Sequence, residues 1–134
     1  MYLFDTDIVS YLTRRFPIQP VYDRFHAAPA ANRFISAITV MELRRGARLH
    51  PAGDALWQRI VNEIFPFVEI IPVAKDEAVG AADLQARMQL AGQILPEADT
   101  IIAATALVHN LILITRNIRH FERITEVRLE NWFV

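Results

Sequence analysis

The sequence predicts an α/β fold in which a short, mostly parallel sheet of about five strands is flanked by helices. Short apolar runs alternate with longer segments whose apolar residues recur at helical spacing. One apolar run, at residues 111–115, is uninterrupted, as in a strand buried on both faces. The chain has 134 residues, of which 53% are hydrophobic, enough for a single domain over residues 1–134.

The first half of the chain is expected to contain two strands, over residues 2–4 and 34–36. Pro17 and Pro20 frame a connection between the first two helices. The S/T-x-x-E pattern of residues 39–42 indicates the start of another helix. Apolar residues at helical spacing predict helices over residues 8–15, 21–28, 39–49 and 56–65.

The second half begins with a predicted third buried strand at residues 67–71. A helix over residues 75–90 is expected to end at Gly92. Pro96 begins a helix, residues 97–109, that is apolar almost all round and therefore predicted to be central. After the strand at 111–115, the sequence predicts a short polar loop, an edge strand at 127–129 and a packed tail at 132–133.

Composition limits the function classes. The net charge is −1, and the 14 basic residues are one lysine and thirteen arginines, which suit phosphate recognition. Near-neutrality argues against binding nucleic acid by overall charge alone, but allows a nuclease whose acidic centre cancels a basic rim. The absence of cysteine excludes disulfides, thiolate zinc sites and thiol nucleophiles. With no signal peptide and no long apolar stretch, we expect a cytoplasmic protein that has no membrane partner.

Several polar side chains are expected at one edge of the sheet. Asp5 and Asp7 follow the first strand, and Asn117 follows the strand at 111–115. Glu42 and Asp99 are assigned to the first turns of helices. Ligands bind beyond the carboxyl ends of the strands in open α/β sheets, so these residues can converge. Carboxylates ~5 Å apart repel by roughly 3 kcal/mol at an effective dielectric constant near 20, so a cluster predicts a bound cation.

Oxygen ligands favour Mg²⁺ or Mn²⁺ over zinc and point to phosphodiester hydrolysis. Each residue also has a structural explanation. An aspartate after the first strand can cap the next helix, and Glu42 can complete a capping box with Thr39. Asp99 can complement a helix dipole, and Asn117 can be a turn residue. None of these roles explains why carboxylates from separate segments should gather.

Four segments together resemble the PIN-domain ribonucleases. They are LFDTD at residues 3–7, ISAITVMEL at 35–43, LPEADTIIAA at 95–104 and ITRN at 114–117 with Phe121. Their order and spacing, with the ending VRLENW at 127–132, are most similar to the VapC toxins of bacterial type II toxin–antitoxin pairs. The resemblance covers essentially the whole chain.

The resemblance implies a Rossmann-like three-layer sandwich with the activity of a Mg²⁺-dependent endoribonuclease, for which Mn²⁺ is a possible substitute. Such an enzyme cleaves RNA phosphodiesters by metal-activated water and leaves a 5′-phosphate and a 3′-hydroxyl. The resemblance also implies a cognate VapB-like antitoxin that blocks the site, and a homodimer that forms a heteromeric complex with the antitoxin.

By position, the resemblance assigns catalytic roles to Asp5, Glu42, Asp99 and Asn117. Asp5 and Asp99 are the expected direct metal ligands, and Glu42 is a ligand either directly or through water. Asn117 falls where many relatives have aspartate, and Asp7 where relatives often have asparagine. The residues expected to support the cluster are Thr6, Asp7 and Thr115.

Arginines follow two of the candidate segments. The resemblance makes them a rim that grips RNA phosphates, and the alternative is a solvated face with local ion pairs. His109 and His120 are interpreted as ordinary residues of the core edge or surface. The arginines assigned to RNA binding are Arg44, Arg45, Arg116 and Arg119.

Two other functions are considered. A phosphatase with a nucleophilic aspartate would share the D-x-D pattern at residues 5–7, but it would also require a suitable lysine and a later acidic pair. The only lysine is Lys75, and no adjacent acidic pair follows residues 111–115. The second alternative is a catalytically degenerate PIN-like module that binds RNA or a protein. Asn117 favours this module, whereas Asp5, Glu42 and Asp99 favour the enzyme.

Overall fold

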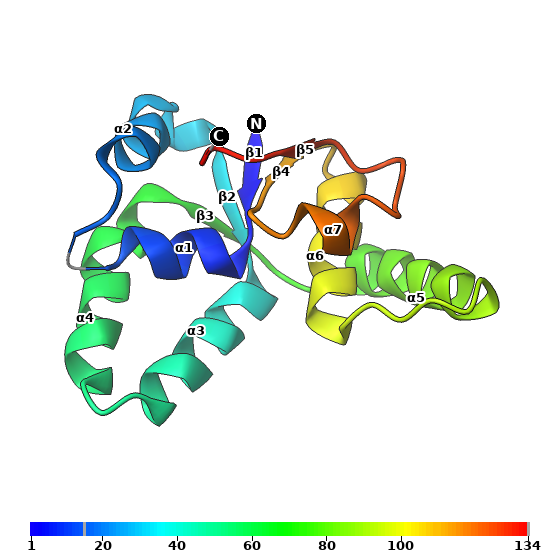
Figure 1. The fold of residues 1–134 in the computed structure, drawn as a ribbon, viewed down its shortest axis with the longest axis horizontal. Coiled ribbons are helices and arrows are strands. Elements are labelled where there is room, and N and C mark those ends of the chain that lie inside the picture. Colours follow the sequence, from blue (N-terminus) through cyan, green and yellow to red (C-terminus); the bar gives the residue numbers. More distant parts are fainter. Residues whose placement is uncertain (15, 134) are drawn as a thin grey trace.

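The computed structural model describes residues 1–14 and 16–133. Within these residues, five strands form one sheet in the order β3-β2-β1-β4-β5, and every pairing is parallel (Figure 1). The strands are β1 (Tyr2–Phe4), β2 (Arg33–Ser36), β3 (Glu69–Ile71), β4 (Ile112–Ile114) and β5 (Leu129–Glu130). The α-helices are α1 (Thr6–Leu12), α2 (Gln19–Ala27), α3 (Ala37–Leu49), α4 (Gly53–Glu63), α5 (Lys75–Leu90), α6 (Glu97–Val108) and α7 (Ile118–Phe121).

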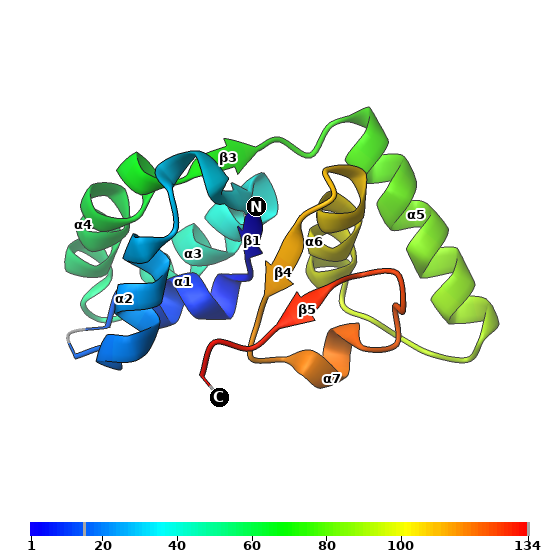
Figure 2. The same cartoon turned by 90° about the horizontal axis from the view of Figure 1, so that it is seen from above.

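Two hydrophobic cores cover the two faces of the sheet. Alternate residues of a strand point to opposite faces, so Leu3 and Leu113 pack into a core with residues of α5, α6 and α7. Phe4 and Ile114 pack into the other core, with residues of α1, α2, α3 and α4. The two groups of helices lie on opposite sides of the strands in Figures 1 and 2. The expected three-layer α/β sandwich is confirmed.

The helix boundaries show where local sequence signals suffice. Helix α5 has the predicted bounds, and Gly92 follows it with a φ of 69°, which favours glycine. The first helix was predicted to reach residue 15 but ends at Leu12, and Arg15 lies outside the described residues. Pro20 lies in the first turn of α2, not in the connection, because the first turn does not need its backbone N–H. In the described part of the chain, no helix is long and apolar enough to cross a membrane.

The third strand predicted at residues 67–71 is present, but it is shorter than predicted and it is not buried. Strand β3 begins at Glu69, pairs with β2 and lies at one edge of the sheet, where Ile70 is 39% exposed. An apolar run alone does not reveal whether a strand is central or at an edge. The polar loop predicted after β4 contains α7, a single turn that is too short for a periodic signal, although its Phe121 is fully buried.

Candidate active site

Asp5 is the most buried of the candidate carboxylates, with 4% of its surface exposed. It follows β1 directly, and its backbone N–H donates to the Ile114 carbonyl of β4 at 3.0 Å. Asp5 Oδ1 accepts the Thr6 backbone N–H at 2.8 Å, which caps α1, while Oδ2 accepts the Thr115 hydroxyl at 2.8 Å. Asp5 therefore caps α1 and also holds its carboxylate at the carboxyl ends of β1 and β4.

Asp7 adds a second carboxylate close to Asp5. Asp7 Oδ2 accepts the Arg116 backbone N–H at 3.2 Å, whereas Oδ1 is buried and has no hydrogen-bond partner in the described residues. Burial, followed by the negative charge of Asp7, raises the pKa of Asp5 to about 8, and burial also raises the pKa of Asp7. A positive charge at this position would offset the cost of ionising these groups.

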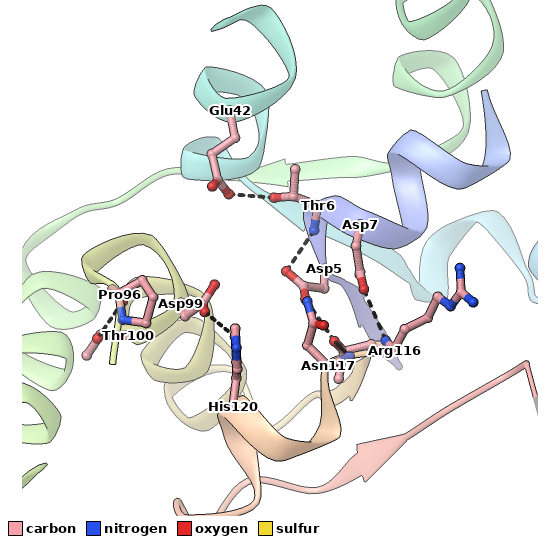
Figure 3. A network of polar contacts seen from close by, with 11 residues as sticks. Asp5, Thr6, Asp7, Glu42, Pro96, Asp99, Thr100, Arg116, Asn117 and His120 are labelled. Atoms are coloured by element: carbon pink, nitrogen blue, oxygen red, sulfur yellow. Dashed lines mark hydrogen bonds and ion pairs between the residues drawn. The ribbon is translucent and has the colours of Figure 1, made fainter. Parts of the chain in front are cut away.

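Asp99 reaches toward Asp5 from the first turn of α6 (Figure 3). Its negative charge contributes to the raised pKa of Asp5. Asp99 Oδ2 lies 3.0 Å from His120 Nδ1, and the Asp99 side chain is 18% exposed. The position of Asp99 is compatible with a favourable interaction with the N-terminus of α6, but its carboxylate is directed toward Asp5 and His120.

Glu42 reaches the site through Thr6. Helix α3 begins at Ala37 after the cap Ser36, whose Oγ accepts the Ile38 N–H at 3.1 Å, so the predicted start at residue 39 is wrong. Glu42 consequently lies in the second turn and forms no capping box with Thr39. Instead, Glu42 Oε1 accepts the Thr6 hydroxyl at 2.7 Å, and the same hydroxyl lies 3.0 Å from the Thr39 hydroxyl.

Asn117 belongs to the turn between β4 and α7, and Figure 3 shows it beside Asp5. Its backbone N–H donates to Thr115 Oγ1 at 2.9 Å, and the Thr115 hydroxyl donates to Asp5. Thr115 therefore links the turn to the buried carboxylate, which agrees with a supporting role.

The donor set fits a hard divalent cation. Asp5, Asp7 and Asp99 supply carboxylate oxygens of the kind that Mg²⁺ prefers, and one of them, Asp7 Oδ1, is buried without a partner in the described residues. No group of three or more His, Asp or Glu side chains in residues 1–14 and 16–133 is close enough to hold one ion. Mg²⁺ keeps several waters and commonly uses one or two carboxylates, so this arrangement suits direct ligation by two aspartates.

The arginines assigned to RNA binding have different surroundings. The Arg116 guanidinium lies over two aromatic rings, 4.2 Å from the centre of Phe133 and 5.7 Å from that of Tyr11. The Arg44 guanidinium lies over Trp57 at 4.9 Å, which links α3 to α4. Arg45 and Arg119 are exposed. Arg116 is therefore fixed both at its backbone, by Asp7, and at its side chain.

His120 is a candidate functional residue that the sequence analysis missed. It was interpreted as an ordinary surface residue, but its ring contacts Asp99. No local sequence signal marks this contact, because Asp99 lies 21 residues earlier in the chain. His109 agrees with the interpretation as a core-edge residue, because it pairs with Glu77 at 2.8 Å between α5 and α6.

Comparisons with known proteins agree with this geometry. A family model described as the PIN domain matches residues 2–127. The chain is 34% identical over 127 residues to the VapC ribonuclease Y4jK of Sinorhizobium fredii, covering 91% of each protein. A solved DNA-bound VapBC structure from Salmonella typhimurium superimposes with a TM-score of 0.89 at 27% identity, covering 98% of this chain and 97% of that chain. A toxin–antitoxin complex from Klebsiella pneumoniae gives a TM-score of 0.69 at 30% identity, covering 95% of each chain.

Proposed function

Because the chain belongs to the PIN-domain family, we infer that it is an endoribonuclease and the toxin of a type II toxin–antitoxin pair. Its partners are an RNA substrate and a cognate antitoxin protein, as the similarity to VapBC and toxin–antitoxin structures supports. The observation that carries the catalytic assignment is the meeting of Asp5 and Asp99 at one edge of the sheet. We place the protein in the cytoplasm, where such a toxin meets its RNA.

The enzyme depends on a metal ion, for which we propose Mg²⁺, with Mn²⁺ as a substitute. Asp5 and Asp99 hold the ion directly, and Glu42 acts through water. When bound, such an ion lowers the pKa of a water molecule and stabilises negative charge on a phosphoryl oxygen. The raised pKa of Asp5 and the unpartnered Asp7 Oδ1 support this assignment. A nearby positive charge lowers the pKa of Asp5 and attracts the Asp7 oxygen.

The surrounding residues orient the carboxylates. The Thr6 backbone and the Thr115 hydroxyl each donate to one oxygen of Asp5, which fixes the plane of its carboxylate. The Thr6 hydroxyl donates to Glu42 and sets the position of that side chain. Asn117 adds an amide oxygen without charge, so we propose that it contacts water or phosphate beside Asp5. Residues 1–134 together make one catalytic domain.

The proposed activity is tested by RNA cleavage with Mg²⁺ or Mn²⁺. We expect cleavage of a mixed RNA substrate by the purified chain, loss of cleavage in EDTA and recovery when excess metal is added. Asp99→Asn, purified in parallel, is expected to be inactive because the amide does not supply the negative charge that holds the ion.

Three outcomes would contradict the function. Cleavage that survives in EDTA or in the Asp99→Asn preparation would indicate a contaminating nuclease. RNA binding without cleavage under all metal conditions would support the degenerate PIN-like module. Release of phosphate from small phosphomonoesters would support the phosphatase.

Arg116 is the RNA contact that the geometry favours among the four candidate arginines, because its backbone N–H donates to Asp7, close to Asp5, and its guanidinium lies over Tyr11 and Phe133. In an inactive Asp99→Asn background, Arg116→Gln is expected to weaken RNA binding similarly for different sequences. The plot of log affinity against log salt should become shallower by about one unit. Fluorescence anisotropy over a salt series measures both effects.

The matched control is Arg128→Gln, because Arg128 is exposed and engaged by Asn110 at a turn, through the carbonyl and Oδ1, both at 3.0 Å. Its salt dependence should equal that of the Asp99→Asn parent. If Arg116→Gln also leaves the slope unchanged, Arg116 does not contact RNA phosphate. Arg44, Arg45 and Arg119 are then compared in the same assay.

A further inference from the structure

Hydrogen bonds made by Thr115, Asn117 and His120 link the two aspartates proposed to hold the metal, and Figure 3 shows the last of them, between His120 and Asp99. The Thr115 hydroxyl donates to Asp5 Oδ2 at 2.8 Å and accepts the Asn117 N–H at 2.9 Å. The Asn117 carbonyl accepts the His120 backbone N–H at 3.0 Å. His120 Nδ1 then lies 3.0 Å from Asp99 Oδ2. The turn after β4 and the helix α7 therefore connect Asp5 to Asp99.

We propose that His120 is a positioning residue that holds the Asp99 carboxylate in the orientation required for metal binding. The inference rests on the proposed metal-dependent activity. An ionised carboxylate can only accept a hydrogen bond, so Nδ1 is the donor in this contact. Oδ2 is engaged by the ring, and Oδ1 remains available on the same carboxylate. Groups that orient metal ligands in this way contribute substantially to affinity.

The backbone of His120 is well placed for this role. Helix α7 has a single turn, which is fixed by the fully buried Phe121 and by the hydrogen bond from Ile124 N to the Phe121 carbonyl at 2.9 Å. The imidazole therefore projects from an anchored segment, and its contact with Asp99 requires no further ordering of the backbone. A site residue is held precisely when its supporting groups are themselves fixed by packing and hydrogen bonds.

Asp99 depends on this contact. Among the described residues, the side-chain hydrogen bond to the Asp99 carboxylate comes from His120. No side chain in these residues caps the N-terminus of α6. Without the ring, the Asp99 carboxylate would be free to rotate about its side-chain bonds. The ion would then have to order the carboxylate on binding, which lowers its affinity.

The test compares three substitutions by measuring Mn²⁺ affinity, with isothermal titration calorimetry or the electron paramagnetic resonance signal of free Mn²⁺. His120→Ala is expected to weaken Mn²⁺ binding by about 10-fold, within the range for loss of a group that orients a metal ligand. His120→Asn places an amide N–H near the position of Nδ1 and should restore most of the affinity. His120→Gln places its amide near Nε2 and should resemble His120→Ala.

Kinetics provide a second readout. Cleavage by His120→Ala should fall at low Mn²⁺ and recover as Mn²⁺ is raised, while KM for RNA at saturating metal stays near the wild-type value. His50→Ala is the matched control, because His50 is an exposed histidine at the end of α3 whose Nδ1 accepts the Ala52 backbone N–H at 3.0 Å. Its Mn²⁺ affinity should be unchanged. Thermal unfolding of each variant shows that the fold is retained.

The possible results distinguish a failure of the role proposed for His120 from a failure of the proposed function. Wild-type affinity for Mn²⁺ in His120→Ala would show that His120 does not position Asp99. Recovery by Gln but not by Asn, with a raised KM for RNA, would show that the ring contacts RNA through Nε2 and would also overturn the proposal. Failure of the wild-type chain to bind Mn²⁺ or to cleave RNA would instead overturn the proposed function, and the inference with it.

Discussion

Asp5→Asn is expected to abolish RNA cleavage and, at the same time, to stabilise the metal-free protein near pH 8. The loss of activity should be at least about 10²-fold, because a metal ion contributes several kcal/mol of transition-state stabilisation. The fold should survive, since asparagine caps a helix about as well as aspartate. The new NH2 group replaces one of the two oxygens that accept from Thr6 and Thr115, and it can donate instead to Asp7 Oδ1, which is buried without a partner in the described residues.

The stability change follows from the raised pKa of Asp5. Its pKa is about 8 in the folded protein, against an ordinary value of 3.8, because of burial and the neighbouring Asp7. Between these pH values the folded state holds a proton that the unfolded state has released. The free energy of unfolding therefore falls as pH rises from about 4 to about 8. Asp5→Asn removes this titration, so its stability should depend less on pH.

Thermal unfolding in EDTA at pH 5, 6.5 and 8 measures this effect. The wild-type Tm should fall as pH rises across the series. The Tm of Asp5→Asn should fall less, and at pH 8 it should be higher than the wild-type Tm. Each kcal/mol corresponds to about 4 °C for a chain of this size. Asp99→Asn is the matched control, because it should also lose cleavage but keep most of the pH dependence. If the Tm of Asp5→Asn falls with pH as steeply as the wild-type Tm does, Asp5 is not the group that titrates.

Much of the fold could be predicted because its signals are local. The helix at Lys75–Leu90 and its end at Gly92 follow from apolar spacing and a glycine at positive φ. The central strand β4 follows from an uninterrupted apolar run. By contrast, the edge position of β3 depends on which strand lies beside it, and the short helix α7 depends on the burial of Phe121. Neither fact is encoded in a local pattern.

The candidate site also contains some residues that local sequence signals identify and others that they do not. Asp5 could be placed because it directly follows a strand, and Asp99 because it lies in the first turn of a helix. For Glu42, a local pattern allows a capping box with Thr39 beside the catalytic role, whereas its actual partner Thr6 is 36 residues away. His120 was missed for a similar reason, since Asp99 lies 21 residues earlier in the chain. Contacts between distant segments require the topology.

Arg33 is another residue whose role depends on distant contacts, and Arg33→Met is expected to destabilise the fold by at least about 3 kcal/mol. Arg33 is 6% exposed, and its guanidinium lies 5.1 Å from the centre of the Phe25 ring. It donates to the carbonyls of Ala28 at 2.9 Å, Phe67 at 3.0 Å and His26 at 3.3 Å. Methionine fills part of the volume but leaves these carbonyls without their donor, at a cost of about 1–3 kcal/mol for each one that stays buried.

Urea denaturation measures the loss, and two further variants identify its cause. Arg33→Lys keeps the charge but replaces the planar fork with one ammonium group that cannot reach three carbonyls in the same geometry, so it should also be clearly destabilised. Arg128→Met removes an exposed arginine that bonds only Asn110 among the described residues, and should cost less than about 1 kcal/mol. If Arg33→Met were as mild as Arg128→Met, the three carbonyls would have to be hydrated in the folded protein. Arg33 would then not join the end of α2 to the segment before β3.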